Sequence, residues 1–265
     1  MYRKHFGLTR HPFTNEIDVD DLFPSAAMRE LEARLKYLLD LRGIGLVTGE
    51  PGSGKTTVTR RVTTQLHKGL YRVVYVPLST GNVMDVYKTI AWALGLPTVR
   101  SRAALYRAIS DEVTRLCVEA KARPVLIIDE AHHLRSEVLE DLRLLTNYNM
   151  DSENRLTLLL LGQAELRRRL SMAVHEALAQ RVVVRHHVPP LEHDEVGPYL
   201  QHLLRLAGTE VPLFEEPAIA AIFQATNGLA RKVNRVAHYA LNAATIGRDR
   251  QVSAAHIEAA LTELT

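Results

Sequence analysis

Short runs of large apolar residues recur through the first 190 positions of this 265-residue chain, and helix-compatible stretches separate them. Because a run of consecutive apolar side chains suits a strand buried on both faces, each run predicts a strand. Strands that alternate with helices are typical of a parallel sheet with helices on both faces, so the pattern predicts an α/β fold. The predicted strands span residues 44–48, 72–77, 124–129, 156–162 and 182–188.

The pattern changes at Pro189-Pro190, after which the strand runs stop and helical spacing takes over. Ser253 is placed to cap the last predicted helix, and Ser25 to cap one that begins near the N-terminus. The helical patterns lie near 192–207, 215–226, 229–246 and 253–264. We therefore expect an N-terminal arm over residues 1–30, an α/β core over 31–190 and a helical domain over 191–265.

A glycine-rich stretch, GEPGSGKTT, follows the first predicted strand and precedes a helical run. It satisfies the P-loop pattern G-x-x-x-x-G-K-[ST] in full, in the strand–loop–helix context that the pattern requires. Lys55 is expected to reach the β- and γ-phosphates of a nucleoside triphosphate, and the Thr56 hydroxyl to bind Mg²⁺. The loop residues expected to bind the nucleotide are Gly49, Pro51, Gly52, Ser53, Gly54, Lys55, Thr56 and Thr57.

A carboxylate pair, Asp129-Glu130, ends the apolar run that starts at Pro124. Ligands of open α/β sheets bind at the carboxyl ends of the strands, so this pair is expected to face the nucleotide. Asp129 is the expected Mg²⁺ carboxylate, and Glu130 is placed to orient the attacking water. Together with the P-loop, the pair predicts a nucleoside triphosphate hydrolase that uses Mg²⁺.

Composition indicates the cellular compartment but identifies no partner. The chain is 46% hydrophobic and 24% charged, and it has a single cysteine, Cys117, which fits a reducing cytoplasm. No apolar segment approaches 18 residues, so we expect no membrane span. The net charge of +3 permits an anionic polymer as partner without requiring one. The neighbouring pairs His132-His133 and His186-His187 are expected to point apart, and hence not to bind a metal.

Three further polar positions are spaced as if to sense the γ-phosphate. Gln163 follows the fourth predicted strand, so its side chain is expected between the P-loop strand and the Asp129 strand. Arg181 precedes the last strand, and Arg231 lies near the start of a helix in the helical domain. For each residue alone, a solvated surface side chain is the favoured interpretation, but their order along the chain favours a nucleotide-driven machine.

That order resembles the AAA+ ATPases, and in particular the ExeA/TniB/TnsC-like group of bacterial ATPases. The resemblance is carried by FGL-x-x-x-PF from Phe6, the P-loop, IIDEAHHL from Ile127, EVLEDLRLLTN from Glu137, LLGQAEL from Leu160, QRVVVRHHVPPL from Gln180 and GLARKVNRVAHYAL from Gly228. It implies that Gln163 is sensor 1, Arg181 the arginine finger acting on a neighbouring subunit, and Arg231 sensor 2 in a helical lid. Arg185 is a rival for the finger, and Ala230 stands where relatives often have proline.

The resemblance leaves the use of the ATP open among three classes. One set of relatives drives secretion-system assembly and carries a membrane segment and a cell-wall-binding domain, neither of which we expect in this chain. A second set regulates DNA transposition: these ATPases form rings or helical filaments on duplex DNA, recruit a transposase or targeting protein, and leave on hydrolysis. We expect the second class, in the cytoplasm. Helicase loaders are a third class with a similar core.

A DNA contact is expected between the second and third predicted strands. Arg100, Ser101 and Arg102 gather at the start of a predicted helix, where backbone N–H groups also favour a phosphate, and Lys88 is placed to assist. Nothing there suggests base reading, so binding should tolerate any sequence and weaken with salt. Arg167–Arg169 and the arm residues Tyr2–His5 are further candidates for partner contacts, the arm also for covering the adenine.

Overall fold

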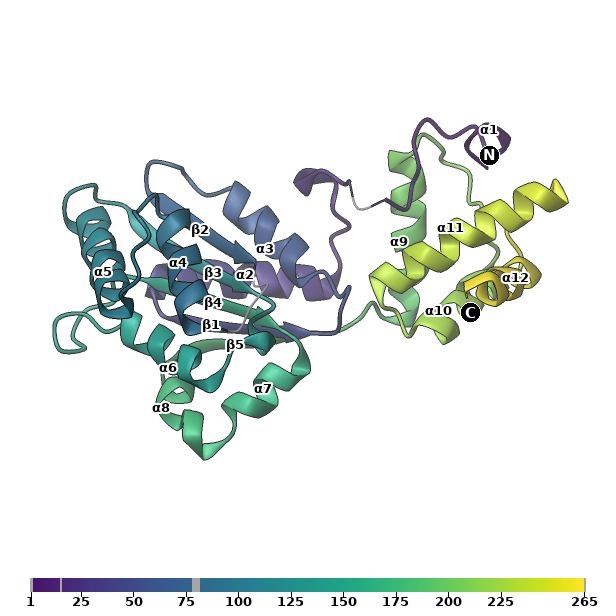
Figure 1. Ribbon diagram of the computed structural model, residues 1–265. Helices are drawn as coiled ribbons and strands as arrows, with labels where there is room; N and C mark the ends of the chain where they lie inside the picture. The colour runs from purple at the N-terminus through teal and green to yellow at the C-terminus, as the bar shows by residue number, and fades with distance from the viewer. Residues whose placement is uncertain (1, 15, 78–81, 265) are drawn as a thin grey trace. The chain divides into compact units, whose positions relative to one another are not determined.

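The computed structural model describes residues 2–14, 16–77 and 82–264. Within it the chain forms two compact units (Figure 1). The α/β unit comprises Glu30–Gly49 and Lys55–Val188. The helical unit comprises the residues up to Arg29, the segment Glu50–Gly54 and the residues from Pro189 onward. The tip of the P-loop therefore belongs to the helical unit, whereas Lys55 belongs to the α/β unit.

The α/β unit is built on a five-stranded parallel sheet with the order β2-β3-β4-β1-β5. All five predicted strands are confirmed to within one residue at each end. Strand β4 lies between β3 and β1, so Gln163, which follows β4, is placed between the Asp129 strand and the P-loop strand, as the sequence predicted. The strands are β1 (Ile44–Gly49), β2 (Tyr71–Pro77), β3 (Arg123–Asp129), β4 (Thr157–Gly162) and β5 (Val182–Val188).

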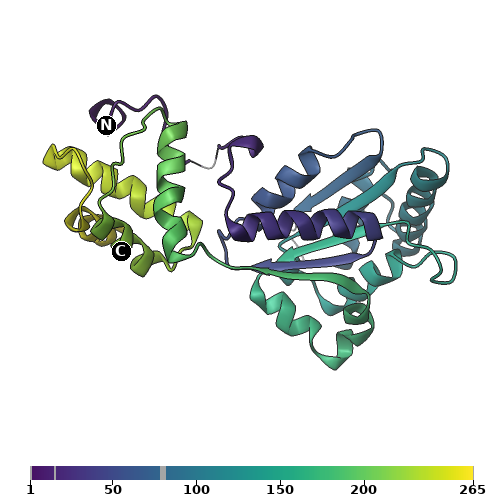
Figure 2. The same cartoon turned by 180° about the vertical axis from the view of Figure 1, so that it is seen from behind.

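Alternate strand residues pack against helices on opposite faces of this sheet. One face carries Ile44, Leu126, Leu158 and their even-numbered neighbours, in one buried cluster with α4 (Val83–Ala93), α5 (Arg102–Val118) and α6 (Ser136–Leu145). The other face is covered by α2 (Ala26–Leu41), which lies across the sheet in Figure 2 and behind it in Figure 1. A Cβ at Gly45 would lie 2.3 Å from Leu38 Cδ2, so this glycine lets α2 approach the sheet closely.

Two serines act as N-terminal caps, one of α2 and one of α5. Ser25 Oγ accepts from the N–H of Met28 at 3.2 Å, which confirms the predicted cap of α2. Ser101 Oγ accepts from the N–H of Ala104 at 3.3 Å and caps α5. The α/β unit also contains α3 (Lys55–Thr64), α7 (Ala164–Leu170) and α8 (Glu176–Gln180), with 3₁₀ turns η2 (Ala131–His133) and η3 (Ala173–His175).

Four helices form the core of the helical unit, and each matches a predicted helical stretch. They are α9 (His193–Leu206), α10 (Glu216–Thr226), α11 (Ala230–Gly247) and α12 (Ala254–Leu264). Ser253 does precede α12, and its hydroxyl lies 3.0 Å from Nδ1 of His256. In the part of the chain that the structure describes, no helix is both long and apolar enough to span a membrane.

The N-terminal residues pack into this helical core. Tyr2, in α1 (Tyr2–His5), is only 1% exposed, and its hydroxyl lies 3.1 Å from His238 Nδ1 and 2.7 Å from His11 Nδ1. Burial raises the pKa of Tyr2 to about 12. The FGL-x-x-x-PF stretch also packs into this helical core, where Leu8 is buried. The expectation that Tyr2 serves the adenine or a neighbour is therefore wrong, because the ring is a core side chain.

Replacing Tyr2 with alanine should lower the free energy of unfolding by about 3 kcal/mol, because a buried aromatic ring leaves a cavity. Phenylalanine at this position keeps the ring and should cost about 1 kcal/mol for the lost hydroxyl contacts. Urea denaturation followed by circular dichroism measures both. Tyr37→Ala is the matched control, since Tyr37 is 58% exposed. A Tyr2→Ala variant as stable as the control would contradict the packing role.

Candidate nucleotide site

The P-loop adopts a conformation that requires glycine at two positions. Gly52 and Gly54 have φ values of 87° and 91°, in the left-handed region that other residues avoid. Lys55 then begins α3, and its ammonium group donates to the carbonyl of Gly49 at 2.8 Å. Lys55 is only 8% exposed, so a cation is held back against the end of β1, where a phosphate-binding lysine belongs.

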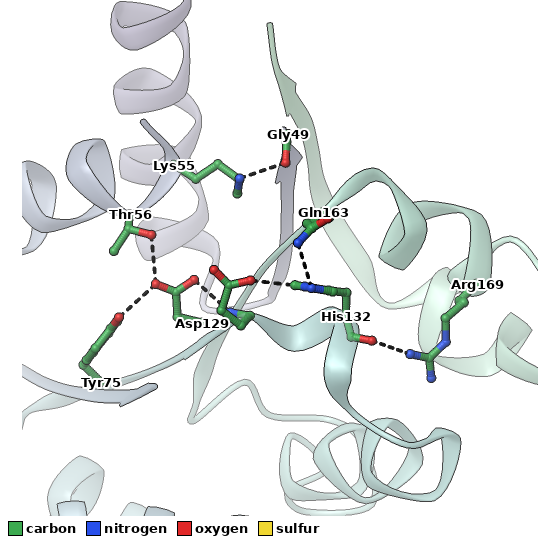
Figure 3. Close-up of polar contacts among 9 residues, drawn as sticks. Gly49, Lys55, Thr56, Tyr75, Asp129, His132, Gln163 and Arg169 are labelled. Atoms are coloured by element: carbon green, nitrogen blue, oxygen red, sulfur yellow. Dashed lines mark hydrogen bonds and ion pairs between the residues drawn. The ribbon is translucent and has the colours of Figure 1, made fainter. Parts of the chain in front are cut away.

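Asp129, the last residue of β3, is the polar centre of the α/β unit (Figure 3). It is 5% exposed, and its Oδ2 accepts from Thr56 Oγ1 and from the Tyr75 hydroxyl, each at 2.8 Å. Its Oδ1 accepts from the N–H of Glu130, also at 2.8 Å. The structure thus joins the two residues predicted to hold Mg²⁺. Since the Thr56 hydroxyl donates to Asp129, its oxygen lone pairs are left for a cation.

Sequence reasoning missed Tyr75. This residue lies on β2, which pairs with β3 so that Pro77 is opposite Asp129. Burial and the Asp129 carboxylate raise the pKa of the Tyr75 hydroxyl, so it stays a proton donor at all ordinary pH values. Only the order of the strands reveals this contact, because β2 and β3 are separated in sequence by two helices.

Glu130 occupies an unusual backbone position. Its φ and ψ are 55° and 34°, the left-handed conformation, which a glutamate adopts only when the surrounding structure imposes it. Its side chain is half exposed, and Oε2 lies 3.4 Å from Nδ1 of His132. The turn therefore aims the Glu130 carboxylate out of the sheet edge beside Asp129 instead of continuing the strand.

Gln163 points at His132 (Figure 3). Its Nε2 lies 3.0 Å from Nε2 of His132, so the polar residue after β4 contacts the turn after β3. The prediction that His132 and His133 point apart is wrong: they lie on a 3₁₀ turn, and their ring centroids are 4.0 Å apart. Ligand atoms of Glu130, His132 and His133 all lie within 4.8 Å of one another. Mg²⁺ prefers oxygen ligands, so this nitrogen-rich group does not displace Thr56 and Asp129 as its expected ligands.

Arg169 fixes the turn that carries His132. Its Nη1 donates to the His132 carbonyl at 2.8 Å (Figure 3), and its Nη2 donates to the Leu134 carbonyl at 2.7 Å. Of the three arginines in this basic run, Arg169 therefore has a structural task, and the other two are exposed. No sequence motif indicated it, because the turn lies more than thirty residues earlier in the chain.

Arg181 and Arg185 both have partners inside the chain. The Arg181 guanidinium forms an ion pair with Asp151, and 23% of its side chain is exposed. Arg185 Nη2 donates to the carbonyl of Ala179. An arginine finger would act on another subunit, so Arg181 would first have to leave Asp151.

Arg231, the second residue of α11, lies against the P-loop tip within the helical unit. Its backbone N–H donates to the carbonyl of Gly52 at 3.4 Å. A Cβ on Gly52 would approach Arg231 Cβ to 2.5 Å, so Gly52 is required by contact as well as by its φ. Alanine at position 230 leaves Arg231 near the start of the helix, as the sequence indicated.

The predicted DNA contacts are only partly available. Arg102 forms an ion pair with Asp141, and the Ser101 hydroxyl is used in the cap of α5. Arg100 is exposed and has no hydrogen bond or ion pair among the residues described. Lys88 is half-buried on α4, and Trp92, one turn later, is 76% exposed. The sequence analysis did not single out Trp92, since exposure cannot be read from a single residue.

Comparison with known proteins agrees with this geometry. The family model described as "AAA domain" (AAA_22) matches residues 39–170. Residues 39–170 therefore form an AAA domain. The crystal structure of Cdc6p from Pyrobaculum aerophilum has the same fold, with a TM-score of 0.74 at 18% identity over 95% of this chain and 70% of that one. The predicted fold is confirmed: a P-loop AAA+ core with C-terminal helices. This domain is of the class that hydrolyses ATP and uses Mg²⁺.

Two curated relatives bear on the group. The "General secretion pathway protein A" of Aeromonas hydrophila is 35% identical over 92% of this chain. The "ATP-dependent target DNA activator B" of Escherichia phage Mu is 29% identical over 51% of this chain. The resemblance to the ExeA/TniB/TnsC-like group is thus confirmed. The matched regions cover 45% and 39% of these relatives, so the chain spans less than half of their length.

Tyr75→Phe should raise the Mg²⁺ concentration for half-maximal ATPase activity about tenfold, because Asp129 loses a donor that orients it. The affinity of the protein for nucleotide in the absence of Mg²⁺ should not change. Tyr71→Phe is the matched control: Tyr71 lies on the same strand, and its hydroxyl accepts from Arg123 and not from a site residue. Equal Mg²⁺ requirements for both variants would show that Tyr75 does not position Asp129.

Proposed function

We propose that Lys55, Thr56, Asp129, Glu130 and Gln163 form the hydrolytic site. Lys55 and the loop residues Gly49, Pro51, Gly52, Ser53, Gly54 and Thr57 hold the phosphates, with Arg231 as sensor 2. Thr56 and Asp129 hold Mg²⁺, which neutralises phosphate charge during transfer. The Thr56–Asp129 bond of 2.8 Å supports this pair.

Glu130 is the proposed base. Its carboxylate is half exposed and follows directly after Asp129, so it can receive a proton from a water molecule that approaches the γ-phosphate. Gln163 holds that water or the γ-phosphate oxygen through its amide. Residues 31–190 act as the ATPase core, 191–265 as the lid, and 1–30 as an arm, which the structure packs largely with the helical unit.

Arg181 is proposed to complete the site of a neighbouring subunit, so that hydrolysis depends on assembly. In support, Arg181 directly follows α8, and among the described residues its side chain pairs with an exposed aspartate, Asp151. An exposed ion pair contributes little stability, so a phosphate can replace Asp151 at small cost.

For the biological role, we propose an ATPase that assembles on duplex DNA and regulates transposition by recruiting a transposase to target DNA. The observation that carries this proposal is the α4–α5 stretch, where Lys88, Trp92 and Arg100 offer two cations and an exposed aromatic ring. Cations bind phosphates whatever the sequence, and exposed aromatic rings stack on bases. The phage relative, named for target DNA activation, supports the same reading.

The second candidate is a secretion-assembly ATPase without a nucleic-acid partner. The specific observation in its favour is the higher identity to the Aeromonas relative, over nearly the whole of this chain. The two candidates share the ATP site, so only a test of DNA dependence separates them.

The deciding experiment is sedimentation of the Glu130→Gln variant with ATP and duplex DNA across a salt series. Loss of the base should leave ATP bound, so large complexes should form only with both ATP and DNA and should weaken as salt rises. Lys88→Ala/Arg100→Ala should lower DNA affinity about tenfold at low salt, since two phosphate contacts are lost. Lys68→Ala/Arg250→Ala removes two exposed cations elsewhere and serves as the control.

Assembly that needs ATP but ignores DNA would overturn the transposition proposal and leave the secretion-type role. Trp92 is the only tryptophan in the chain, so its fluorescence reports on the α4–α5 stretch in the same samples. Quenching by DNA that the Lys88→Ala/Arg100→Ala pair reduces would place the contact there.

The finger assignment has its own test. Arg181→Ala should retain ATP binding and assembly but lose at least about 10³-fold in kcat within the assembled state. Asp151→Ala frees Arg181 and should not lower kcat. Arg185→Ala is the control for a nearby arginine. If Arg185→Ala, and not Arg181→Ala, abolishes hydrolysis in the assembly, the finger is Arg185.

A further inference from the structure

Three side chains line up between the strands β3 and β4 at their carboxyl ends. Gln163 Nε2 lies 3.0 Å from His132 Nε2, and His132 Nδ1 lies 3.4 Å from Glu130 Oε2. The imidazole therefore stands between the residue proposed to sense the γ-phosphate and the proposed base. Figure 3 shows the ring of His132 directed at the Gln163 amide, with Asp129 on the neighbouring strand end.

The contact with Gln163 determines which ring nitrogen carries the proton. The Gln163 amide nitrogen can only donate, so Nε2 of His132 must accept, and the proton of a neutral ring then lies on Nδ1. That proton faces the Glu130 carboxylate. The reverse amide orientation would put the proton on Nε2 and turn the bare Nδ1 lone pair toward a negative oxygen, which is electrostatically unfavourable. Burial lowers the pKa of His132 and so favours this neutral ring.

The position of the ring is fixed from several sides. His132 is 8% exposed, and Arg169 binds its carbonyl. Its Nδ1 is buried and has no hydrogen-bond partner among the described residues, at 3.4 Å from the nearest charged oxygen. A buried donor left unpaired is costly, so a small rotation of the half-exposed Glu130 side chain toward Nδ1 is favoured.

We propose that His132 is a positioning residue that couples Gln163 to Glu130. Its ring accepts from Gln163 at one nitrogen and donates to the Glu130 carboxylate from the other. If the Gln163 amide moves when it contacts the phosphate, the position of the Glu130 carboxylate therefore changes as well. His132 neither touches the nucleotide nor takes the proton of the water. This inference rests on the proposed roles of Glu130 and Gln163, and not on the DNA-related proposal.

The kinetic test uses two substitutions of His132. His132→Leu removes both ring nitrogens and should lower kcat about 10- to 100-fold, because a misplaced base loses catalytic geometry. The KM for ATP should stay within about twofold of the parent value, because His132 makes no contact with the nucleotide. His132→Gln carries one acceptor and one donor and should recover part of the loss. His133→Ala is the matched control, as His133 is exposed and adjacent.

Coupling to Gln163 is measured by a double-mutant cycle. If the ring transmits the effect of Gln163, His132→Leu combined with Gln163→Ala should be no slower than the worse single variant. Multiplicative losses, or a His132→Leu kcat within about twofold of the parent, would overturn the proposal. Retained binding of a fluorescent ATP analogue and an unchanged melting temperature show that the variants fold. Should His132→Leu fail to fold, the same cycle is run with His132→Gln.

A spectroscopic readout is independent of activity. Long-range ¹⁵N–¹H correlation spectra of the full chain should show His132, assigned by its loss in His132→Gln, as the Nδ1–H tautomer. Gln163→Ala should shift this resonance toward the Nε2–H form. An Nε2–H ring in the parent protein would overturn the proposal. Failure of the proposed site would look different: Glu130→Gln would then hydrolyse ATP normally, whatever the state of His132.

Discussion

The α/β unit depends on a constraint at one carboxylate. Asp129 is almost fully buried at a strand end, and a buried carboxylate is tolerated only when its oxygens are paired. Three donors meet this need, from β2, from α3 and from the backbone of the next residue. The carboxyl ends of β2 and β3 and the start of α3 are thereby tied to a single charge. The same donors leave that charge oriented for a metal, so the stability of this region and its chemistry share one set of contacts.

Much of the fold could be predicted because its signal is local. The spacing of apolar residues predicts the five buried strands and the four C-terminal helices. The P-loop is predicted by its glycines, two of which take positive φ. Gln163 was also expected between two strands, and the order of the sheet places β4 between β3 and β1. These features need no knowledge of distant side chains.

The rest of the site is set by pairing across the chain, which no local pattern reveals. Tyr75 becomes a site residue only because β2 lies beside β3, and Arg169 only because α7 returns to the turn after β3. The direction of His132 and His133 was misjudged because the chain makes a 3₁₀ turn there, where neither helix nor strand geometry applies. Arg102 had looked like a phosphate ligand, but Asp141, on another helix, binds its guanidinium.

The helix α7 is attached to the turn after β3 at two points along its length. Gln163, just before its first residue, contacts the His132 ring, and Arg169, near its last, binds the His132 carbonyl. Two separate attachments restrain rotation about either one, so they hold α7 and the turn that carries Glu130 in one orientation relative to each other. A partner bound on the exposed side of α7, where Arg167 and Arg168 lie, would therefore be connected through this turn to the carboxylate proposed to prepare the water.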